Sequence, residues 1–249
     1  MIIRLKVTTM KLGVITDIHN NLAALKVIVE RLNQLECDKI ICCGDISGIG
    51  PCPEETVQYM MQIHNLIEVR GNHEKYLLEG MPNEYPNEEQ MNIGEMKHHK
   101  WEHSLLSRES VDFLKKLPYR IDDVYEGYEL SIMHYCMDKE GHYINYTANP
   151  SEGDLKTMFG DVRSDIILYG HDHRRNICKG DKLYINVGSL GCPAQDKNLA
   201  RAGIVYIEKG NVEIEPIDVE YDVNDVIKVI DEINYPEADN IKKFFYGIW

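Results

Sequence analysis

Short apolar runs alternate with segments of helical periodicity through the first third of the chain. Residues 12–16, 39–43 and 66–70 form three apolar runs of strand length. Between the first two runs, residues 21–35 place leucines and Ile28 on one helical face, and residues 54–62 predict a second helix that Pro53 begins. Strand, helix, strand, helix, strand predicts βαβ units and a parallel sheet.

The remainder of the chain changes character twice. Residues 74–117 are polar, rich in Glu and Met and broken at Pro82 and Pro86, which predicts a helical cap or insertion. The second half is rich in strands, with hairpin turns at Glu126-Gly127 and Lys209-Gly210. Its predicted strands cover residues 119–125, 128–134, 165–169, 174–178, 182–187, 202–207 and 212–217.

The pattern favours a single domain over residues 1–249, with two packed sheets between helices and a C-terminal helical tail at about 222–249. Phe244, Phe245 and Trp249 make the end of this tail apolar, so it either packs on the body or contacts a partner chain in a homo-oligomer. Residues 1–9 are either an extension upstream of an alternative start or an extra edge strand.

Charge and cysteine content narrow the classes of function. A net charge of −14 argues against a nucleic-acid-binding protein, because such proteins carry a basic face. No apolar stretch reaches the roughly 18 residues of a membrane span, and Arg4, Lys6 and Lys11 interrupt any signal peptide. The seven cysteines have no framework spacing, which favours a reducing compartment and a cytoplasmic protein.

Metal-competent side chains follow five of the apolar runs directly. Because ligands bind beyond the carboxyl ends of strands in open α/β sheets, these residues are expected to converge. The clusters are Asp17-Ile18-His19, Gly44-Asp45, Gly71-Asn72-His73-Glu74, His134, and Gly170-His171-Asp172-His173.

Each cluster alone has an ordinary structural alternative. Asp17 or Asn72 could cap a helix, Gly44-Asp45 could be a turn, and His134 could be a satisfied core or surface histidine. Five such coincidences together are improbable. Mixed nitrogen and oxygen donors suit Mn, Fe, Co, Ni or Zn, and the number of donors fits two ions that share a carboxylate. Such a pair, about 3.5–4 Å apart, can activate water and clamp the attacking and leaving oxygens of a phosphoester.

The set D-I-H, G-D, G-N-H-E, a lone strand-end His and G-H-D-H resembles the calcineurin-like metallophosphoesterase superfamily, and most of all its small bacterial and archaeal phosphodiesterase branch. The resemblance covers about residues 10–217. It implies an α/β fold, a four-layer α/β/β/α sandwich of two mixed sheets with a helical cap insertion, and a dinuclear site at the sheet ends.

The resemblance also implies roles for individual residues. Asp45 would bridge two divalent ions, with Mn expected and Fe, Ni, Co or Zn as alternatives. His73 would contact the phosphate or protonate the leaving oxygen, and Glu74 either orients His73 or is a solvated carboxylate in the first turn of a helix. Asn186-Val187-Gly188-Ser189 matches a further signature with an expected supporting role. The first ion would be held by Asp17, His19 and His173, and the second by Asn72, His134 and His171.

Several positions depart from the family pattern. Asn20 replaces a common Gly but tolerates left-handed backbone. Tyr135-Cys136-Met137 after His134 should narrow the pocket, and Asp172 should add negative charge beside the ions.

Substrate-contacting residues are less well marked than the metal ligands. The candidates are Arg174, Tyr135 and His142, with Tyr143 and Tyr146 nearby, although Arg174 and Arg175 are more simply explained as charges at a strand edge. In the predicted cap, Trp101 could form an apolar wall for a nucleoside or aryl group. His99 and His103 could hold a third ion, but a solvated helix face is the favoured interpretation there.

The function expected from these residues is hydrolysis of a small phosphodiester by in-line attack of a metal-bridging hydroxide, assisted by His73. A phosphomonoesterase, including a protein phosphatase or a dinucleoside polyphosphate hydrolase, is the nearest alternative. It would need extra cations, for which only Arg174, Arg175, Arg163 and Arg70 are candidates, and this favours the diester. A non-catalytic scaffold and a nuclease are less favoured, because every expected ligand is present and the chain is acidic.

Overall fold

A computed structural model describes residues 9–87, 91–138, 142–144 and 146–248. The first sheet has the order β10-β9-β1-β2-β3, and the second has the order β4-β5-β6-β8-β7. The strands of the first sheet are β1 (Met10–Ile15), β2 (Lys39–Cys42), β3 (Leu66–Glu68), β9 (Leu199–Glu208) and β10 (Asn211–Glu220). Those of the second are β4 (Arg120–Tyr125), β5 (Tyr128–Met133), β6 (Ile166–Leu168), β7 (Asn176–Lys179) and β8 (Leu183–Asn186).

Both sheets are mixed. β1, β2 and β3 are parallel because the helices α1 (Leu22–Gln34) and α2 (Pro53–Met60) connect them, whereas β9 and β10 add an antiparallel pair. The predicted hairpin at Glu126-Gly127 is confirmed: φ is 50° and 90° at these residues, and Tyr125 pairs with Tyr128 across the turn.

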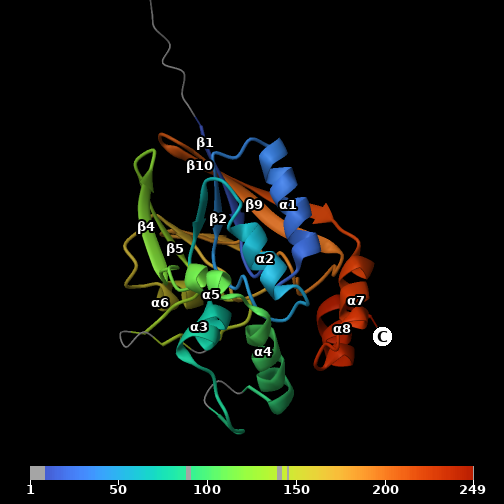
Figure 1. Cartoon of the computed structure of the whole chain (residues 1–249). Helices are drawn as coiled ribbons and strands as arrows, with labels where there is room; N and C mark the ends of the chain where they lie inside the picture. The colour runs from blue at the N-terminus through green and yellow to red at the C-terminus, as the bar shows by residue number, and fades with distance from the viewer. Residues whose placement is uncertain (1–8, 88–90, 139–141, 145, 249) are drawn as a thin grey trace, which may run out of the picture.

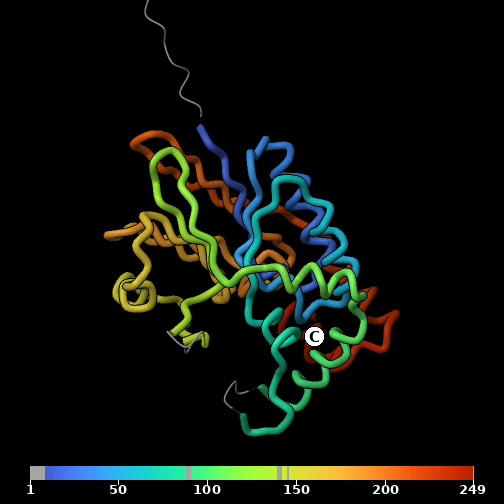
Figure 2. Tube along the Cα trace, turned by 60° about the vertical axis from the view of Figure 1, so that its left-hand side comes forward, coloured from blue at the N-terminus to red at the C-terminus, as the bar shows by residue number. Residues whose placement is uncertain are grey.

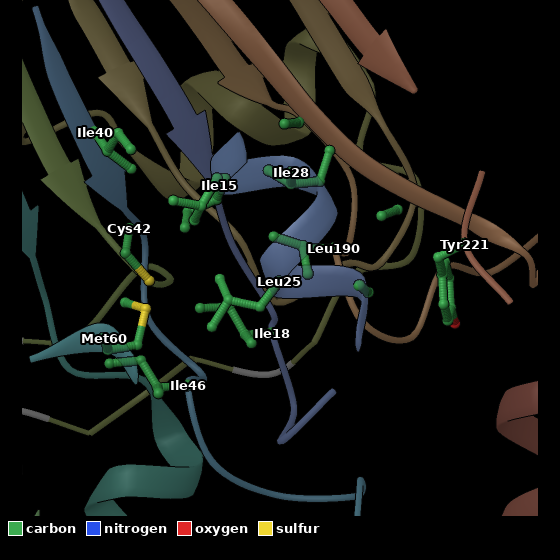
Figure 3. Packing of buried hydrophobic residues seen from close by; sticks show 14 of the residues in the cluster. Ile15, Ile18, Leu25, Ile28, Ile40, Cys42, Ile46, Met60, Leu190 and Tyr221 are labelled. Carbon is green, nitrogen blue, oxygen red and sulfur yellow. The ribbon is translucent and has the colours of Figure 1, made fainter. Parts of the chain in front are cut away.

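Alternation along β1 divides the core into layers. Leu12 and Val14 point into the apolar cluster between the two sheets, and Ile15 points to the opposite face, where α1 packs. Ile18, Leu25 and Ile28 continue this outer cluster (Figure 3). With α7 (Val223–Glu232) and α8 (Ala238–Tyr246) joining α1 and α2, and α6 (Glu152–Met158) beneath the second sheet, the predicted four-layer α/β/β/α sandwich is confirmed.

Three helices occupy the segment predicted as a cap. They are α3 (Asn72–Glu79), α4 (Ile93–Leu105) and α5 (Arg108–Leu114). Figure 1 shows α3 and α4 below the sheets, at the end where β1 and β2 finish, and Figure 2 shows the C-terminus close to the same end. The cap and the C-terminal tail therefore approach the edge at which the ligand clusters were expected.

Some elements differ from the predicted ones. α6 was not predicted, and β10 extends to Glu220 although it contains Pro216, which an edge strand tolerates.

Tyr246 of the tail is buried against the body while Phe244 is exposed, and contact with a partner chain stays a prediction. The prediction for residues 1–9 falls almost entirely outside the described residues. Within the described part of the chain, no helix has the length and apolarity needed to cross a membrane.

Arg175 joins the two sheets at their open edge. It lies just before β7 of the second sheet, and its Nε donates to Val187 O at 3.0 Å. Its Nη2 donates to Ala202 O and Ile217 O on β9 and β10 of the first sheet, both at 3.2 Å, and pairs with Asp218 Oδ1 at 2.6 Å. Arg175 is thus a structural crosslink between the sheets.

We expect Arg175→Ala to destabilise the protein by about 3 kcal/mol, because several carbonyl oxygens and Asp218 lose a charged donor. Arg175→Lys should recover only part of this loss, since an ammonium group cannot reproduce the planar fork. The matched control is Arg174→Ala, whose side chain is 50% exposed and should cost less than about 1 kcal/mol. Urea unfolding followed by circular dichroism measures all three; equal losses for Arg174→Ala and Arg175→Ala would contradict the crosslink.

Candidate metal centre

The loops after β1 and β6 form one half of a cluster of metal-competent side chains. His19 Nε2 and His173 Nε2 lie 2.9 Å apart. They are 3.8 and 3.6 Å from Asp17 Oδ1. Asp17 and His19 are fully buried and His173 is 23% exposed, so three donor atoms face one another at the inner end of an accessible hollow.

The second half joins the ends of β2 and β5 and the start of α3. His134 Nε2 lies 3.2 Å from Asp45 Oδ2 and 3.0 Å from Asn72 Oδ1. Asn72 Oδ1 is also 3.0 Å from His171 Nδ1. Asp45 Oδ2 is 3.9 Å from His19 Nε2 as well, so this carboxylate lies between the two halves. The structure therefore brings together all seven residues predicted as ligands.

Backbone carbonyls hold two of the rings in one orientation. His19 Nδ1 lies 3.1 Å from Ser47 O, and His134 Nδ1 lies 2.9 Å from Cys43 O. A ring that donates from Nδ1 to a carbonyl turns its Nε2 toward the cluster, which is the usual arrangement for a metal-ligating histidine.

The loops reach this geometry through unusual backbone. Asp17, His19, Asn20, Asp45 and His171 have φ between 49° and 72°, in the left-handed region that non-glycine residues seldom adopt. The prediction that Asn20 tolerates left-handed backbone is confirmed, because its φ is 53°. Such strain persists only where surrounding contacts impose it, and it concentrates at functional sites.

Two glycines permit the close approach of these loops. A Cβ on Gly71 would overlap Asp45 Oδ1, and one on Gly170 would overlap Thr16 Oγ1 and Asp17 Oδ2. The carboxylates of Asp17 and Asp45 can therefore lie against backbone only because no side chain stands there.

Glu74 holds the backbone of the site. Its buried carboxylate accepts hydrogen bonds from Gly71 N at 2.8 Å, Asp45 N at 3.1 Å, and Ser47 N and Oγ at 2.8 Å. The prediction that Glu74 is a solvated carboxylate or orients His73 is wrong, because these four donors occupy its oxygens and it is completely buried.

The buried carboxyl groups of Asp17 and Asp45 make the centre suited to binding cations. Burial raises the pKa of Asp17. Burial acts on Asp45 in the same direction, but the imidazoles of His134 and His73 outweigh it and hold the pKa of the Asp45 carboxyl well below its usual range. Burial would lower the pKa of His134, yet the Asp45 carboxylate raises it to about 9. Within the described residues, every ion-pair partner of the two carboxylates is a histidine, so the donor set fits two divalent ions.

His73 lies beside the cluster without joining it closely. Its Nε2 is 3.9 Å from Asp45 Oδ2, and its Nδ1 has no hydrogen-bond partner among the described residues. Its backbone N–H donates to Asp45 Oδ1 at 3.0 Å, which fixes the start of α3 against the centre. Burial lowers the pKa of His73 to about 4, so the ring is neutral at pH 7 and has one N–H to donate.

His98 and His99 of α4 are buried and His103 is partly buried, so the favoured interpretation of a solvated helix face is wrong. His99 Nδ1 lies 2.8 Å from Glu102 Oε1, while Glu102 Oε2 accepts from Asn20 Nδ2 at 2.9 Å. His99 also contacts the His73 ring, with centroids 4.9 Å apart. His103 Nε2 is 3.7 Å from Glu102 Oε1. Glu102 was missed in the sequence because its partner Asn20 lies 82 residues away.

Asp172 lines the same hollow as His171 and His173, and neighbouring residues occupy its carboxylate. Its oxygens accept from Tyr146 Oη at 3.0 Å and Asn149 N at 2.6 Å, and Oδ1 pairs with Arg174 at 3.4 Å, so Asp172 anchors these neighbours; that it adds charge beside the ions stays a prediction. Tyr135 is buried behind His171, with ring centroids 4.5 Å apart, and its Oη accepts from Thr147 N.

Other predicted residues lie at differing distances from the centre. Arg174 lines a hollow with His171 and His173, whereas His142 is 70% exposed and pairs with Asp138 on an outer loop. In the 186–189 signature, Asn186 Nδ2 donates to Gly170 O and Asp172 O, and Ser189 Oγ donates to Asp17 O. Both are supporting contacts, as expected.

Comparison with known proteins agrees with this geometry. A sequence profile of the calcineurin-like phosphoesterase superfamily domain matches residues 10–210. An uncharacterized protein of Methanocaldococcus jannaschii is 26% identical over an alignment of 249 positions that covers 91% of this chain and 94% of that protein.

Two crystal structures share the fold. A hypothetical protein of Pyrococcus horikoshii OT3 superposes with a TM-score of 0.79 at 18% identity, covering 95% of this chain and 98% of that one. A metallophosphoesterase from Sphaerobacter thermophilus superposes with a TM-score of 0.69 at 22% identity, covering 97% and 100%.

Metal binding should expel a proton from His134. Because its pKa is about 9, the metal-free ring is protonated at pH 7, and a metal must replace that proton. We expect the apparent affinity for Mn²⁺ to rise about tenfold per pH unit between pH 6.5 and 8. Calorimetry in buffers of different ionisation enthalpy measures the proton count; an affinity independent of pH would contradict it.

Glu102→Ala should destabilise the protein by about 3 kcal/mol, because buried donors of Asn20 and His99 lose their acceptor. Burial would raise the pKa of Glu102, but the hydrogen bond from His99 lowers it from the ordinary 4.5 to about 2. The carboxylate therefore stabilises the fold above pH 4.5, and the difference from wild type should shrink as the pH falls toward 2.

Urea unfolding at pH 7 and at lower pH values compares the two proteins. Glu109→Ala, an exposed carboxylate on the neighbouring α5, serves as the control and should change stability by less than about 0.5 kcal/mol. A loss at Glu102 no larger than this control would show that the buried network stabilises nothing.

Proposed function

Because the chain belongs to the calcineurin-like phosphoesterase superfamily and is a metal-dependent phosphoesterase, we propose that its substrate is a small phosphodiester. The observation that carries the proposal is the convergence of seven donor residues into two clusters with Asp45 between them. A buried site with this donor set is suited to phosphoryl chemistry rather than to structural metal binding.

In this proposal, Asp45 would contribute to holding both ions and the other ligands would divide as the two clusters do. Asp17, His19 and His173 would hold one ion, while Asn72, His134 and His171 would hold the other. Manganese is the proposed metal, with Fe, Ni, Co or Zn as alternatives for the same nitrogen and oxygen donors. When bound, two such ions activate water and neutralise charge on the phosphate.

The chain's own contribution at the reacting group comes from His73. Its ring is neutral and buried, and its Nε2 edge faces the centre from the first turn of α3. From this position it donates a hydrogen bond to the phosphate or to the leaving oxygen. The backbone N–H of His73 donates to Asp45 Oδ1, and this hydrogen bond holds the start of α3, and with it the His73 ring, beside the ligands.

The arginines support a diester over a monoester, which carries a second negative charge. Arg70 pairs with Glu79 at 3.1 Å, and Arg175 forms the crosslink to Asp218. Arg163 lines a hollow with Arg120 and Asp122, away from the centre. Of the four arginines that could bind a second charge, Arg174 lines a hollow with candidate ligands, and it too has an acidic partner, Asp172 Oδ1 at 3.4 Å.

One observation favours a phosphomonoester as the second candidate. The hollow beside His171 and His173, of about 380 Å³, is lined by Lys197 as well as Arg174. These two cations outnumber the carboxylate of Asp172 that also lines the hollow, so it suits an anionic group such as the phosphate of a monoester, or the anionic half of a larger diester.

The assay that separates these candidates compares bis(4-nitrophenyl) phosphate with 4-nitrophenyl phosphate, using stripped protein and added Mn, Ni, Co, Zn or Mg. We expect metal-dependent turnover that prefers the diester. His73→Ala should lower kcat/KM by about 100-fold or more, and Asp45→Asn should abolish turnover through lost metal binding.

His142→Ala supplies a matched histidine control, because its exposed ring should change kcat/KM by less than about twofold. Preference for the monoester would select the second candidate. A folded protein without turnover of either ester, with every metal tried, would refute the proposed reaction.

A further inference from the structure

A second hollow opens onto the centre from the other side, at His73. Its volume is about 340 Å³, within the range of small-molecule sites, and α4 and α8 supply most of its walls. α4 contributes His98 and His99, and α8 contributes Phe244 and Phe245. Phe244 is 64% exposed, although Tyr246 of the same helix is buried. Aromatic rings on both helices form walls suited to a flat ring.

The charged groups of this hollow are carboxylates, which accept hydrogen bonds, and they lie beside the uncharged amides of Asn92 and Asn240. Glu95 at the start of α4 and Glu237 at the start of α8 line its rim, and no Lys or Arg is among the described residues that line it. Gly94 lets the two helices meet here, because a Cβ on it would lie 3.0 Å from the Glu237 carboxyl carbon. The hollow therefore disfavours an anion and favours an uncharged group that bears N–H donors.

Phe244 and Phe245 line both this hollow and the cationic one at His171 and His173. The two hollows thus lie on either side of one aromatic wall and differ in charge. A phosphodiester bound at the centre would direct one ester group toward each hollow. The difference in charge between the hollows would then favour an uncharged group in one and an anionic group in the other.

We infer that the hollow at His73 binds the leaving group of the substrate, and that this group is a nucleoside whose base carries an exocyclic amino group. The inference rests on the proposed function for the position of the leaving oxygen, which His73 faces. The base stacks against Phe244, its amino group donates to the carboxylates of the rim, and the other half of the diester lies toward Arg174 and Lys197.

Adenosine is the probe, and inosine, which has a carbonyl in place of the amino group, is the matched comparison. Calorimetry on the metal-loaded protein should show adenosine binding more tightly than inosine. Phe244→Ala should weaken adenosine binding at least about fivefold, because base–aromatic stacking contributes that much or more. Glu237→Gln should reduce the preference for adenosine over inosine.

Ile93→Ala is the control, since Ile93 is an exposed residue of α4 outside the lining of the hollow. It should leave adenosine binding unchanged. Circular dichroism and thermal melting of each variant establish that it is folded. No binding of adenosine to the wild type, equal binding in Phe244→Ala, or equal affinity for inosine would each overturn the inference.

The outcome is separable from that of the ester assay. Turnover of bis(4-nitrophenyl) phosphate without adenosine binding overturns only the leaving-group site. Adenosine binding that depends on Phe244, in a protein that hydrolyses neither ester, supports the site and contradicts the proposed reaction.

Discussion

The buried carboxylates of Asp17 and Asp45 are the constraint on which the rest of the site depends. Each accepts a backbone N–H from another loop: His171 N donates to Asp17, and His73 N donates to Asp45. Glu74 then accepts from the loop that carries Asp45. The loops after β1, β2, β3 and β6 are therefore tied in pairs. Ligand positions are set by backbone hydrogen bonds before any ion binds, which is preorganisation in the physical sense.

These ties also explain how the strained backbone is tolerated. A left-handed non-glycine residue costs on the order of 1 kcal/mol, and Asp17, His19, Asn20, Asp45 and His171 all adopt this conformation. The same turns bring carboxylates within reach of N–H groups, and hydrogen bonds to charged acceptors contribute about 1.5–3 kcal/mol each. Loop geometry and ligand geometry thus have one cause.

The ligand clusters and the layered fold could be predicted because their signals are local. A short apolar run followed directly by Asp, Asn or His predicts a strand and places those side chains at the edge of the sheet where the strand ends. The role of Arg175 depends on Asp218, 43 residues away, and Glu102 depends on Asn20. α6 has only seven residues, too few for a helical period to stand out. Contacts of this kind are fixed by tertiary packing, which a periodicity does not encode.

The cap and the C-terminal tail line the hollow that opens at His73. The hydroxyl of Tyr235, just before α8, donates to Ile49 O in the loop after β2. His98 Nε2 of α4 lies 2.8 Å from Tyr235 Oη. The Trp101 ring packs against it, with centroids 4.8 Å apart. One buried tyrosine therefore joins a ligand-bearing loop, the cap and the C-terminal tail. Because the sheet ends supply the chemistry and Tyr235 fixes the aromatic walls beside His73, changes at the exposed Phe244 of α8 alter substrate choice without disturbing the metal ligands, whereas Glu102 of α4 links the cap to the centre through Asn20.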